Sequence, residues 1–522
     1  MNSVAIHKKT KLAVLPYEAR IAKLIPHCRE VEKNGNQYLL VPAGKEELQL
    51  LRNLGYSTPT PLNIDYDWAG NVPFEAQVIT ADMLIHNPRA YVLSGMGTGK
   101  TLAALFAIDY LIKHGLARKA LIIAPLSTLQ RVWAREVFYR MPHLETSVVH
   151  HSVRKKRLEA LEHEADIYII NHDGPKHITK ELLAKAGIDI VVIDELAVFK
   201  NKQTDLWKAV NLIIQNRKFV WGMTGSPTPK EPADAFAQVK LITPANVPMF
   251  YKQFKERVMT QVSQWRWLPK PDAKETVFDV MQPNVRFTLD QCTDIPPTTY
   301  STREVPLSKE QKKAYKDLAN EYYAEYQGGE ITAVNEGVKR MKLLQVAAGF
   351  VYDNEQNIVA LPCKARVQEA MDIADQCQHK LIIFATFVHV VENLYKEFKA
   401  AKFDCEMVYG GTSATKRNEI FTVFQDTDHI DVLIAHPQCM AHGLTLTAAD
   451  TILWYTPADS LEIYEQANAR IPRAGQDKRT HIIHLESTAV ERKCYRVLEE
   501  RGNMQGALLD LFAEETPQTI AS

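Results

Sequence analysis

The stretch Ser94-Gly95-Met96-Gly97-Thr98-Gly99-Lys100-Thr101 lies between an apolar strand pattern and a helical pattern. Gly95, Gly97 and Gly99, with Thr98 among them, let backbone N–H groups face phosphate oxygens. Lys100 supplies a positive charge to the β and γ phosphates, and the hydroxyl of Thr101 is suited to ligate Mg²⁺. The segment therefore predicts a triphosphate-binding loop with a strand before it and a helix after it.

A second segment, Val191-Val192-Ile193-Asp194-Glu195, ends an apolar strand with two carboxylates. In a parallel sheet this strand would deliver both side chains to the carboxyl edge, beside the phosphate loop. We expect Asp194 to hold the metal and Glu195 to orient or deprotonate the attacking water. Together the two segments predict a site for ATP and Mg²⁺ at which the triphosphate is hydrolysed.

Short apolar strands alternate with helical patterns on both sides of these segments. This alternation predicts parallel sheets covered on both faces. The first series of expected strands spans residues 91–94, 120–125, 167–171, 188–194 and 219–224, and the second spans 380–385, 405–409, 431–435, 451–455 and 481–485. Only the first series carries a phosphate loop.

Bulk composition sets modest limits on function. The chain has 522 residues, with 62 Lys plus Arg and 62 Asp plus Glu, so any contact with nucleic acid must be local. The seven scattered cysteines favour a reducing compartment. Residues 1–15 lack the apolar core of a signal peptide, and no apolar run is long enough for a membrane helix. We therefore expect a cytoplasmic protein that does not bind membranes.

The ordered motifs resemble those of superfamily 2 helicase-like ATPases, and among them the Swi/Snf-type double-stranded DNA translocases. Pro73-Phe74-Glu75-Ala76-Gln77 resembles the segment in which a glutamine reads adenine, which implies that role for Gln77. Three further segments resemble elements that touch the nucleic-acid backbone or couple hydrolysis to movement. The resemblance assigns these roles to Ser127, Thr128, Asn171, Thr224 and Ser226.

The second series continues the resemblance. Gln466-Ala467-Asn468-Ala469-Arg470-Ile471-Pro472-Arg473-Ala474-Gly475-Gln476 is similar to the arginine-finger helix of the family, which implies that Arg470 and Arg473 reach a γ-phosphate when two domains close. Of the two, Arg473 is the favoured finger. The residues that the resemblance places toward the tracked strand or in the coupling elements are Thr386, Gly411, Thr412, Gly443, Thr445 and Gln466, and Gly443 is also assigned to the nucleotide.

Two positions depart from the family pattern. Ala197 stands where the family usually has a histidine that links the metal carboxylates to the coupling motif, so hydrolysis and motion are expected to be linked differently. His442 replaces a small residue in the coupling loop. Neither change removes a group that ATP chemistry requires.

The resemblance implies an α/β fold with two tandem RecA-like parallel-sheet domains, a helical insertion between them and a small N-terminal accessory domain. The expected boundaries are 1–70 for the accessory domain, 71–245 and 363–512 for the two RecA-like domains, 246–362 for the insertion and linker, and 513–522 for a frayed tail. Within the accessory domain we expect a strand at 37–42 and a helix at 45–54, followed by a linker at 57–73.

The leading hypothesis is a nucleic-acid-stimulated ATPase that moves along duplex or branched DNA. Contacts to the backbone would make it insensitive to sequence and sensitive to salt. One alternative is a helicase that separates DNA or RNA strands, with RNA the less favoured polymer. An alternative of another class is a nucleic-acid clamp that binds ATP but scarcely hydrolyses it. Protein partners stay open, and a monomeric state is considered.

Overall fold

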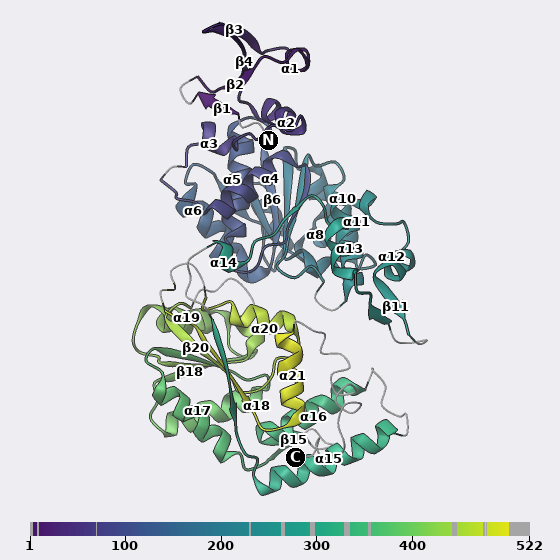
Figure 1. Cartoon of the computed structure of the whole chain (residues 1–522). Coiled ribbons are helices and arrows are strands. Elements are labelled where there is room, and N and C mark those ends of the chain that lie inside the picture. Colours follow the sequence, from purple (N-terminus) through teal and green to yellow (C-terminus); the bar gives the residue numbers. More distant parts are fainter. Residues whose placement is uncertain are drawn as a thin grey trace. The chain divides into compact units, whose positions relative to one another are not determined.

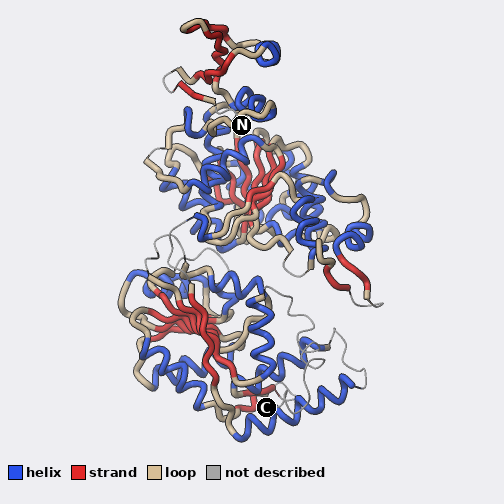
Figure 2. The backbone as a smooth tube through the Cα atoms, viewed as in Figure 1, coloured by secondary structure: helices blue, strands red, loops and turns tan. Residues whose placement is uncertain are grey.

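The computed structural model (Figures 1 and 2) describes residues 4–7, 10–68, 70–228, 231–262, 267–292, 298–327, 335–352, 357–440, 446–472, 476 and 478–500. The chain forms two compact units, Met1–Thr293 and Asp294–Ser522. The prediction of two tandem parallel-sheet domains with a small N-terminal domain is confirmed by a seven-stranded and a six-stranded parallel sheet and a separate antiparallel sheet at the N-terminus.

The N-terminal part of the first unit is a four-stranded antiparallel sheet in the order β1-β2-β4-β3, with two helices. Its elements are β1 (Ala5–His7), β2 (Leu12–Pro16), α1 (Ala19–Leu24), β3 (Arg29–Lys33), β4 (Asn36–Pro42) and α2 (Lys45–Asn53). Leu15, Leu39 and Val41 alternate with more exposed neighbours and enter a small core of their own. The strand and the helix expected from the sequence correspond to β4 and α2.

The stretch expected as a linker, residues 57–73, is packed against the first large sheet domain. It contains the short helix α3 (Leu62–Asp65), and Leu62 is fully buried. The phenol of Tyr66 donates a hydrogen bond to Asp109 Oδ2 (2.5 Å) and its ring lies edge-on to Trp68. These large side chains bury enough apolar surface to hold an otherwise polar, proline-containing stretch in place.

The large sheet of the first unit is entirely parallel, in the order β13-β5-β10-β9-β6-β8-β7. Its strands are β5 (Arg89–Val92), β6 (Lys119–Ala124), β7 (Thr146–Val148), β8 (Ile167–Asn171), β9 (Ile188–Asp194), β10 (Phe219–Met223) and β13 (Asn284–Val285). Along β6, Leu121 and Ile123 enter one core cluster while Ala120 and Ile122 enter another. Both faces of the sheet are therefore covered, as Figure 2 shows for the helices on either side of the strands.

The connections between these strands are mostly helical. The α-helices are α4 (Glu75–His86), α5 (Lys100–Lys113), α6 (Arg135–Arg140), α7 (Arg154–Glu162), α8 (Gly174–His177), α9 (Thr179–Ala184), α10 (Asp205–Ile214), α11 (Ala235–Ile242), α12 (Tyr251–Val258), α13 (Ala273–Val280) and α14 (Leu289–Cys292). The short 3₁₀ turns are η1 (Leu126–Thr128), η3 (Leu196–Phe199), η4 (Pro232–Asp234) and η5 (Pro244–Asn246). The turn η2 (Leu129–Ala134) is π-helical. Strand β11 (Met259–Gln261) pairs with β12 (Trp267–Pro269) outside the large sheet.

The second unit has a parallel sheet in the order β14-β21-β20-β17-β19-β18. Its strands are β14 (Thr299–Glu304), β17 (Lys380–Phe384), β18 (Cys405–Val408), β19 (Val432–Ala435), β20 (Ala449–Trp454) and β21 (His481–Glu486), and β15 (Phe350–Tyr352) pairs with β16 (Ile358–Ala360). The helices are α15 (Lys309–Gln327), α16 (Glu336–Ala348), α17 (Lys364–Gln376), α18 (Val388–Ala400), α19 (Ala414–Asp426), the turn η6 (Pro437–Met440), α20 (Leu461–Asn468) and α21 (Ala489–Glu499).

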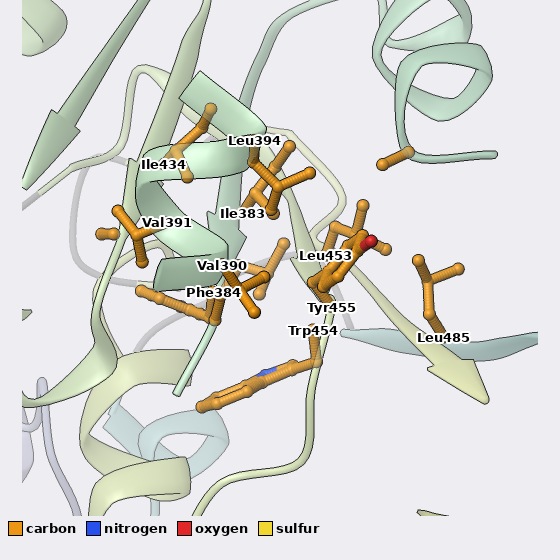
Figure 3. Close-up of a cluster of buried hydrophobic side chains, with 14 of the residues drawn as sticks. Ile383, Phe384, Val390, Val391, Leu394, Ile434, Leu453, Trp454, Tyr455 and Leu485 are labelled. Atoms are coloured by element: carbon orange, nitrogen blue, oxygen red, sulfur yellow. The ribbon is translucent and has the colours of Figure 1, made fainter. Parts of the chain in front are cut away.

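The core of the second unit forms where α18 covers the central strands (Figure 3). Val390, Val391 and Leu394 share one face of α18 at helical spacing and are buried with Ile383 and Leu453 of the sheet. Each fully buried side chain of this size contributes roughly 1.5–3 kcal/mol of transfer free energy.

The middle region, residues 246–362, is shared between the two units. Residues 246–293 belong to the first unit, and Val277 of α13 lies in its core. Residues 294–362 belong to the second unit, where β14 forms an edge of the sheet and Tyr315 of α15 enters the core. Helices α15 and α16 lie within the stretch for which a helical insertion was expected, whereas β14 is not among the strands expected from the sequence.

None of the helices in the described part of the chain combines the length and the apolar character that a bilayer span requires.

Candidate active site

The predicted phosphate loop connects β5 to α5. Gly97 and Gly99 have φ angles of +76° and +77°, a region that favours glycine because it has no Cβ. A Cβ added at Gly99 would also lie 2.1 Å from Gln77 Nε2. The ammonium of Lys100 donates hydrogen bonds to the carbonyl oxygens of Ser94 (2.8 Å) and Gly95 (2.9 Å), which places its charge at the loop. The hydroxyl of Thr98 donates to Gly95 O (2.8 Å) and braces the same turn.

Gln77 connects the start of α4 to this loop. Its Oε1 accepts a hydrogen bond from the N–H of Phe74 (2.9 Å), and its Nε2–H donates to Gly99 O (3.4 Å). The side chain is 5% exposed. The structure thus places Gln77 against the phosphate loop, and its proposed contact with adenine stays a prediction.

The carboxylates lie at the end of β9, which is central in the sheet. Asp194 lies opposite Met223 of β10. Burial raises the pKa of Asp194, although the indole of Trp133 and the ammonium of Lys100 act in the opposite direction. Glu195 has φ +51°, an unusual backbone conformation for a residue with a Cβ, and such strain is common at functional sites. A partly buried carboxylate beside an ammonium and a phosphate loop is suited to a site completed by a divalent cation.

Two aromatic side chains hold Asp194 from neighbouring segments. Trp133 Nε1–H donates to Asp194 Oδ2 (3.1 Å), and His172 Nε2 bonds the carbonyl oxygen of Asp194 (2.7 Å). Because a carbonyl oxygen only accepts, Nε2 of His172 carries the proton. Burial lowers the pKa of His172 and keeps the ring neutral. Neither contact was predictable from the sequence, since partners 61 and 22 positions away carry no spacing signal.

The residues expected to face nucleic acid in the first unit lie at the same edge of the sheet. Asn171 lies opposite Ala124, so β6 and β8 end side by side. Ser127 is exposed, whereas the hydroxyl of Thr128 is buried and donates to Pro125 O (2.9 Å). Parallel strands bring these loops, the phosphate loop and the two carboxylates to one carboxyl edge.

The coupling segment after β10 is tied to the phosphate-loop strand. The N–H of Thr224 donates to Val92 O (3.0 Å), and its hydroxyl accepts from the N–H of Ser226 (3.2 Å). Thr224 is 1% exposed. Thr128 and Thr224 therefore shape their loops from inside, while Ser127, Asn171 and Ser226 keep accessible surface at the edge.

In the second unit, two of the predicted contact residues lie in turns that directly follow strands. The backbone N–H of Thr386 donates to Thr456 Oγ1 (2.8 Å) just after β17. The hydroxyl of Thr412 accepts from the N–H of Tyr409 (3.1 Å), which closes the turn that contains Gly411 after β18. The two turns follow β17 and β18, which lie on either side of β19 in the same parallel sheet, so they share its carboxyl edge.

Arg470 lies just beyond α20 and is 2% exposed. Its Nε–H donates to the carbonyl oxygen of Gln466 (2.8 Å), and Gln466 itself is buried. An arginine finger must present its guanidinium outside its own domain, so the predicted role of Arg470 requires another side-chain conformation. The predictions for Arg473, Gly443 and Thr445 lie outside the described residues.

The residues around the phosphate loop fit Mg²⁺ and a triphosphate. Mg²⁺ prefers oxygen ligands and usually keeps several waters, so one carboxylate and one hydroxyl suffice from the protein. Asp194 and Thr101 are of these types. Thr101 is the second residue of α5 and directly follows the phosphate loop. Lys100 would bind the phosphates in exchange for its bonds to the loop carbonyls.

Comparison with known proteins gives two family matches. The family described as SNF2-related domain matches residues 89–351, and the helicase conserved C-terminal domain matches residues 364–475. The first match spans the phosphate loop and Asp194, and the second spans Arg470.

Three individual proteins illustrate the similarity. Protein p41 of Acyrthosiphon pisum secondary endosymbiont phage 1 is 24% identical over 85% of this chain and 98% of its own length. The SWI/SNF-related matrix-associated actin-dependent regulator of chromatin subfamily A-like protein 1 of Xenopus laevis is 22% identical over 81% of this chain, which spans 42% of that protein. The Sulfolobus solfataricus SWI2/SNF2 ATPase core in complex with dsDNA is 19% identical, with a TM-score of 0.40 over 86% of this chain and 94% of that chain.

Proposed function

The chain belongs to the SNF2-related family of helicase-type, ATP-hydrolysing enzymes, and on that premise we propose that it couples ATP hydrolysis to movement along duplex or branched DNA. The observation that carries the proposal is that the loops with the ATP-site residues and the loops expected to contact DNA lie at one edge of the same sheet. The phosphate loop and the Asp194–Glu195 pair lie beside the loops after β6 and β8, and side chains from those loops bond Asp194 directly.

The residues of the first unit have distinct roles in the proposed reaction. Lys100 and the backbone N–H groups of the glycine-rich loop bind the phosphates. Glu195 orients the attacking water or takes its proton. Bound Mg²⁺ would be held by Asp194 and Thr101 and would neutralise charge that develops on the phosphates. Asp194, which Trp133 holds, fixes where that ion lies.

The second unit would complete the site in the proposed cycle. Arg473, with Arg470, would stabilise the charge of the transition state, and fingers of this kind are worth roughly 10³ to 10⁵ in rate. Polymer bound to Ser127 and Asn171 of the first unit and to the turn at Gly411 and Thr412 of the second would favour closure. The protein moves along the polymer if each closure and opening changes which part of the strand the two units contact.

DNA is the proposed polymer for two reasons. The Swi/Snf-type motifs favour a duplex translocase, and the frog relative is named as a regulator of chromatin. Contacts to phosphates would make binding weaken steeply as salt rises. A cytoplasmic location remains part of the proposal.

ATP turnover should be measured without polymer and with duplex DNA, forked DNA, single-stranded DNA and RNA. We expect strong stimulation by duplex or forked DNA. Stimulation mainly by RNA would overturn the DNA assignment, and no stimulation by any polymer would favour the ATP-binding clamp.

Displacement of a third strand from a DNA triplex then tests movement along an intact duplex. Translocation predicts ATP-dependent displacement, and Lys100→Ala serves as the inactive control. A chain that unwinds forks but leaves the triplex intact would instead be a strand-separating helicase.

A further inference from the structure

Trp133 lies where the proposed DNA-facing loop meets the proposed metal site. Its side chain is fully buried in the core on one face of the sheet. Its Nε1–H donates to Asp194 Oδ2 at 3.1 Å, so the indole contacts the carboxylate itself. A hydrogen bond from a neutral N–H to a carboxylate is charge-assisted, directional and stronger than a neutral one. A small displacement of the indole must therefore change the position of this carboxylate.

The backbone that carries Trp133 is unusual. Trp133 belongs to the π-helical turn η2 (Leu129–Ala134), and this turn follows directly after η1 (Leu126–Thr128). Single π turns are rare and occur often at functional sites, because they insert one residue more than an α-helical turn. A change between π and α geometry rotates the residues at the end of the turn. Coupling between sites requires an element with two arrangements, and this turn is the candidate for that role.

The beginning of this segment lies at the proposed DNA-facing edge. Leu126 is 57% exposed and Ser127 is exposed, whereas Leu129 and Trp133 are buried. Thr128 alone therefore separates Ser127, which DNA would touch, from Leu129 at the start of the buried turn. Force applied at Ser127 is transmitted through backbone that is continuous with Trp133.

Position 197, where the family usually has a histidine that links the metal carboxylates to the coupling motif, offers no side-chain hydrogen bond to Asp194. Ala197 in η3 is 8% exposed, and its methyl group neither donates nor accepts a hydrogen bond. His172 reaches Asp194 only at the carbonyl oxygen, which is not a metal ligand in the proposed site. The indole of Trp133 therefore supplies a polar link to the carboxylate that position 197 lacks.

We propose that Trp133 is a positioning residue that couples DNA bound at the loop after β6 to the placement of Asp194, through the π turn Leu129–Ala134. DNA bound at Ser127 shifts the turn, the indole carries the shift to Asp194 Oδ2, and the metal site becomes competent. This inference rests on the proposed function, because it needs DNA as the ligand at Ser127.

The variant Trp133→Phe removes the N–H and keeps an aromatic ring in the core. We expect the ratio of DNA-stimulated to basal turnover to fall about tenfold, because the coupling free energy carried by about one hydrogen bond is lost. Because coupling of binding is reciprocal, a non-hydrolysable ATP analogue should also lose its effect on DNA affinity, and DNA its effect on analogue affinity. A merely structural role would not abolish this reciprocal change.

Trp221→Phe is the matched control. Trp221 is also fully buried in the first unit, and its Nε1–H donates to a backbone carbonyl, Asn87 O (3.0 Å), rather than to a carboxylate. It should lose similar stability while keeping the stimulation ratio and the reciprocal binding effect. An unchanged ratio in Trp133→Phe, or an equal fall of the ratio in both variants, overturns the inference.

Two outcomes keep this test separate from that of the proposed function. Wild-type protein without any DNA stimulation refutes the proposed function and the inference with it, whereas stimulated wild type with a fully stimulated Trp133→Phe refutes the inference alone. If the variant does not fold, hydrogen exchange of wild-type residues 129–134 replaces it. The ATP analogue with Mg²⁺ and without DNA should change exchange there, and no change would refute the coupling.

Discussion

The hydroxyl oxygen of Ser94 accepts a hydrogen bond from the backbone N–H of Phe287 (3.0 Å), which joins the start of the phosphate loop to a segment 193 residues further along the chain. The N–H of Gly95 donates to Phe287 O (2.8 Å), and the preceding residues form β13 beside β5. Ser94, which replaces the first glycine of the usual loop pattern, thus anchors the segment just before the boundary of the first unit.

Ser94→Ala should loosen this anchor. The substitution leaves the N–H of Phe287 without its acceptor, which costs about 1 kcal/mol. We expect faster hydrogen exchange of the amides at 285–288 and weaker ATP binding by several-fold. Ser147→Ala is the control, because it removes a buried hydroxyl bonded to Ala160 O in the same unit. Equal exchange at 285–288 in both variants would contradict the anchoring role.

Lys100→Ala and Glu195→Gln should each lower ATP turnover by at least about a hundredfold, because the first removes a charge-stabilising group and the second removes the group that orients the attacking water or takes its proton. Lys100 already lies across the loop, and Glu195 stands on the strained turn after β9. DNA binding, measured by fluorescence anisotropy, should persist because neither side chain is proposed to contact DNA. Lys208→Ala removes an exposed lysine paired with Asp205 and should leave turnover intact. Retained turnover in either site variant would refute the site.

Glu491→Ala should destabilise the second unit by about 3–5 kcal/mol, because it leaves the charge of Arg366 buried and unpaired. The two side chains are 2.6 Å apart, and the guanidinium also donates to Tyr455 O, Leu485 O and Ser487 Oγ, so it joins α17 to the ends of β20 and β21. Urea unfolding measures the loss. Glu369→Ala removes the partner of Arg303 in a longer pair, in which Arg303 is exposed, and should cost less than about 1 kcal/mol. Similar losses of unfolding free energy in both variants would contradict the claim that breaking the buried pair costs more than breaking the exposed one.

The parts of the fold that were predictable are those with a local signal. Strands such as β8 and β9 are nearly continuous apolar runs that end in a polar residue, with Asp189 the one interruption in β9, so their bounds match the expected ranges. β14 was missed because Thr299–Glu304 is polar and mostly exposed, as suits a sheet edge. β13 has two residues, and its place is decided by pairing with Tyr91 and Val92 far away in the chain.

In the candidate site, too, the features with a local sequence signal were predictable and those that depend on packing were not. The placement of Lys100 at the phosphate loop and of Asp194 at the strand end was predictable, because phosphate and metal chemistry demand fixed residue types at fixed spacing. The bond from Trp133 to Asp194 was not, because it depends on how the π turn packs against β9. The burial of Arg470 was missed for a similar reason, since a motif specifies a residue type but not its side-chain conformation.

His484 should make the stability of the second unit depend on pH. Burial on β21 lowers its pKa to about 4, although Glu499 Oε1 lies 3.3 Å from Nδ1. The neutral ring satisfies both neighbours, because Nδ1–H donates to Glu499 while Nε2 accepts from the hydroxyl of Tyr464 (2.8 Å). The ring also stacks on Tyr495 with 4.1 Å between centroids. Protonation would place an unsolvated charge in this aromatic layer.

Between pH 4 and 6.5 the unfolded chain binds a proton at His484 that the folded chain does not, so the free energy of unfolding rises with pH across this window. Full stability is reached above pH 6.5, and acidification to pH 4 should remove up to about 3 kcal/mol. Native-state hydrogen exchange of β21 amides, corrected for intrinsic rates, measures this slope. His484→Gln should flatten it, whereas His429→Gln, at an exposed histidine of the same unit, should not. Because carboxylates such as Glu499 titrate in all three proteins, only the difference in slope reports on His484, and equal slopes would contradict its buried neutral state.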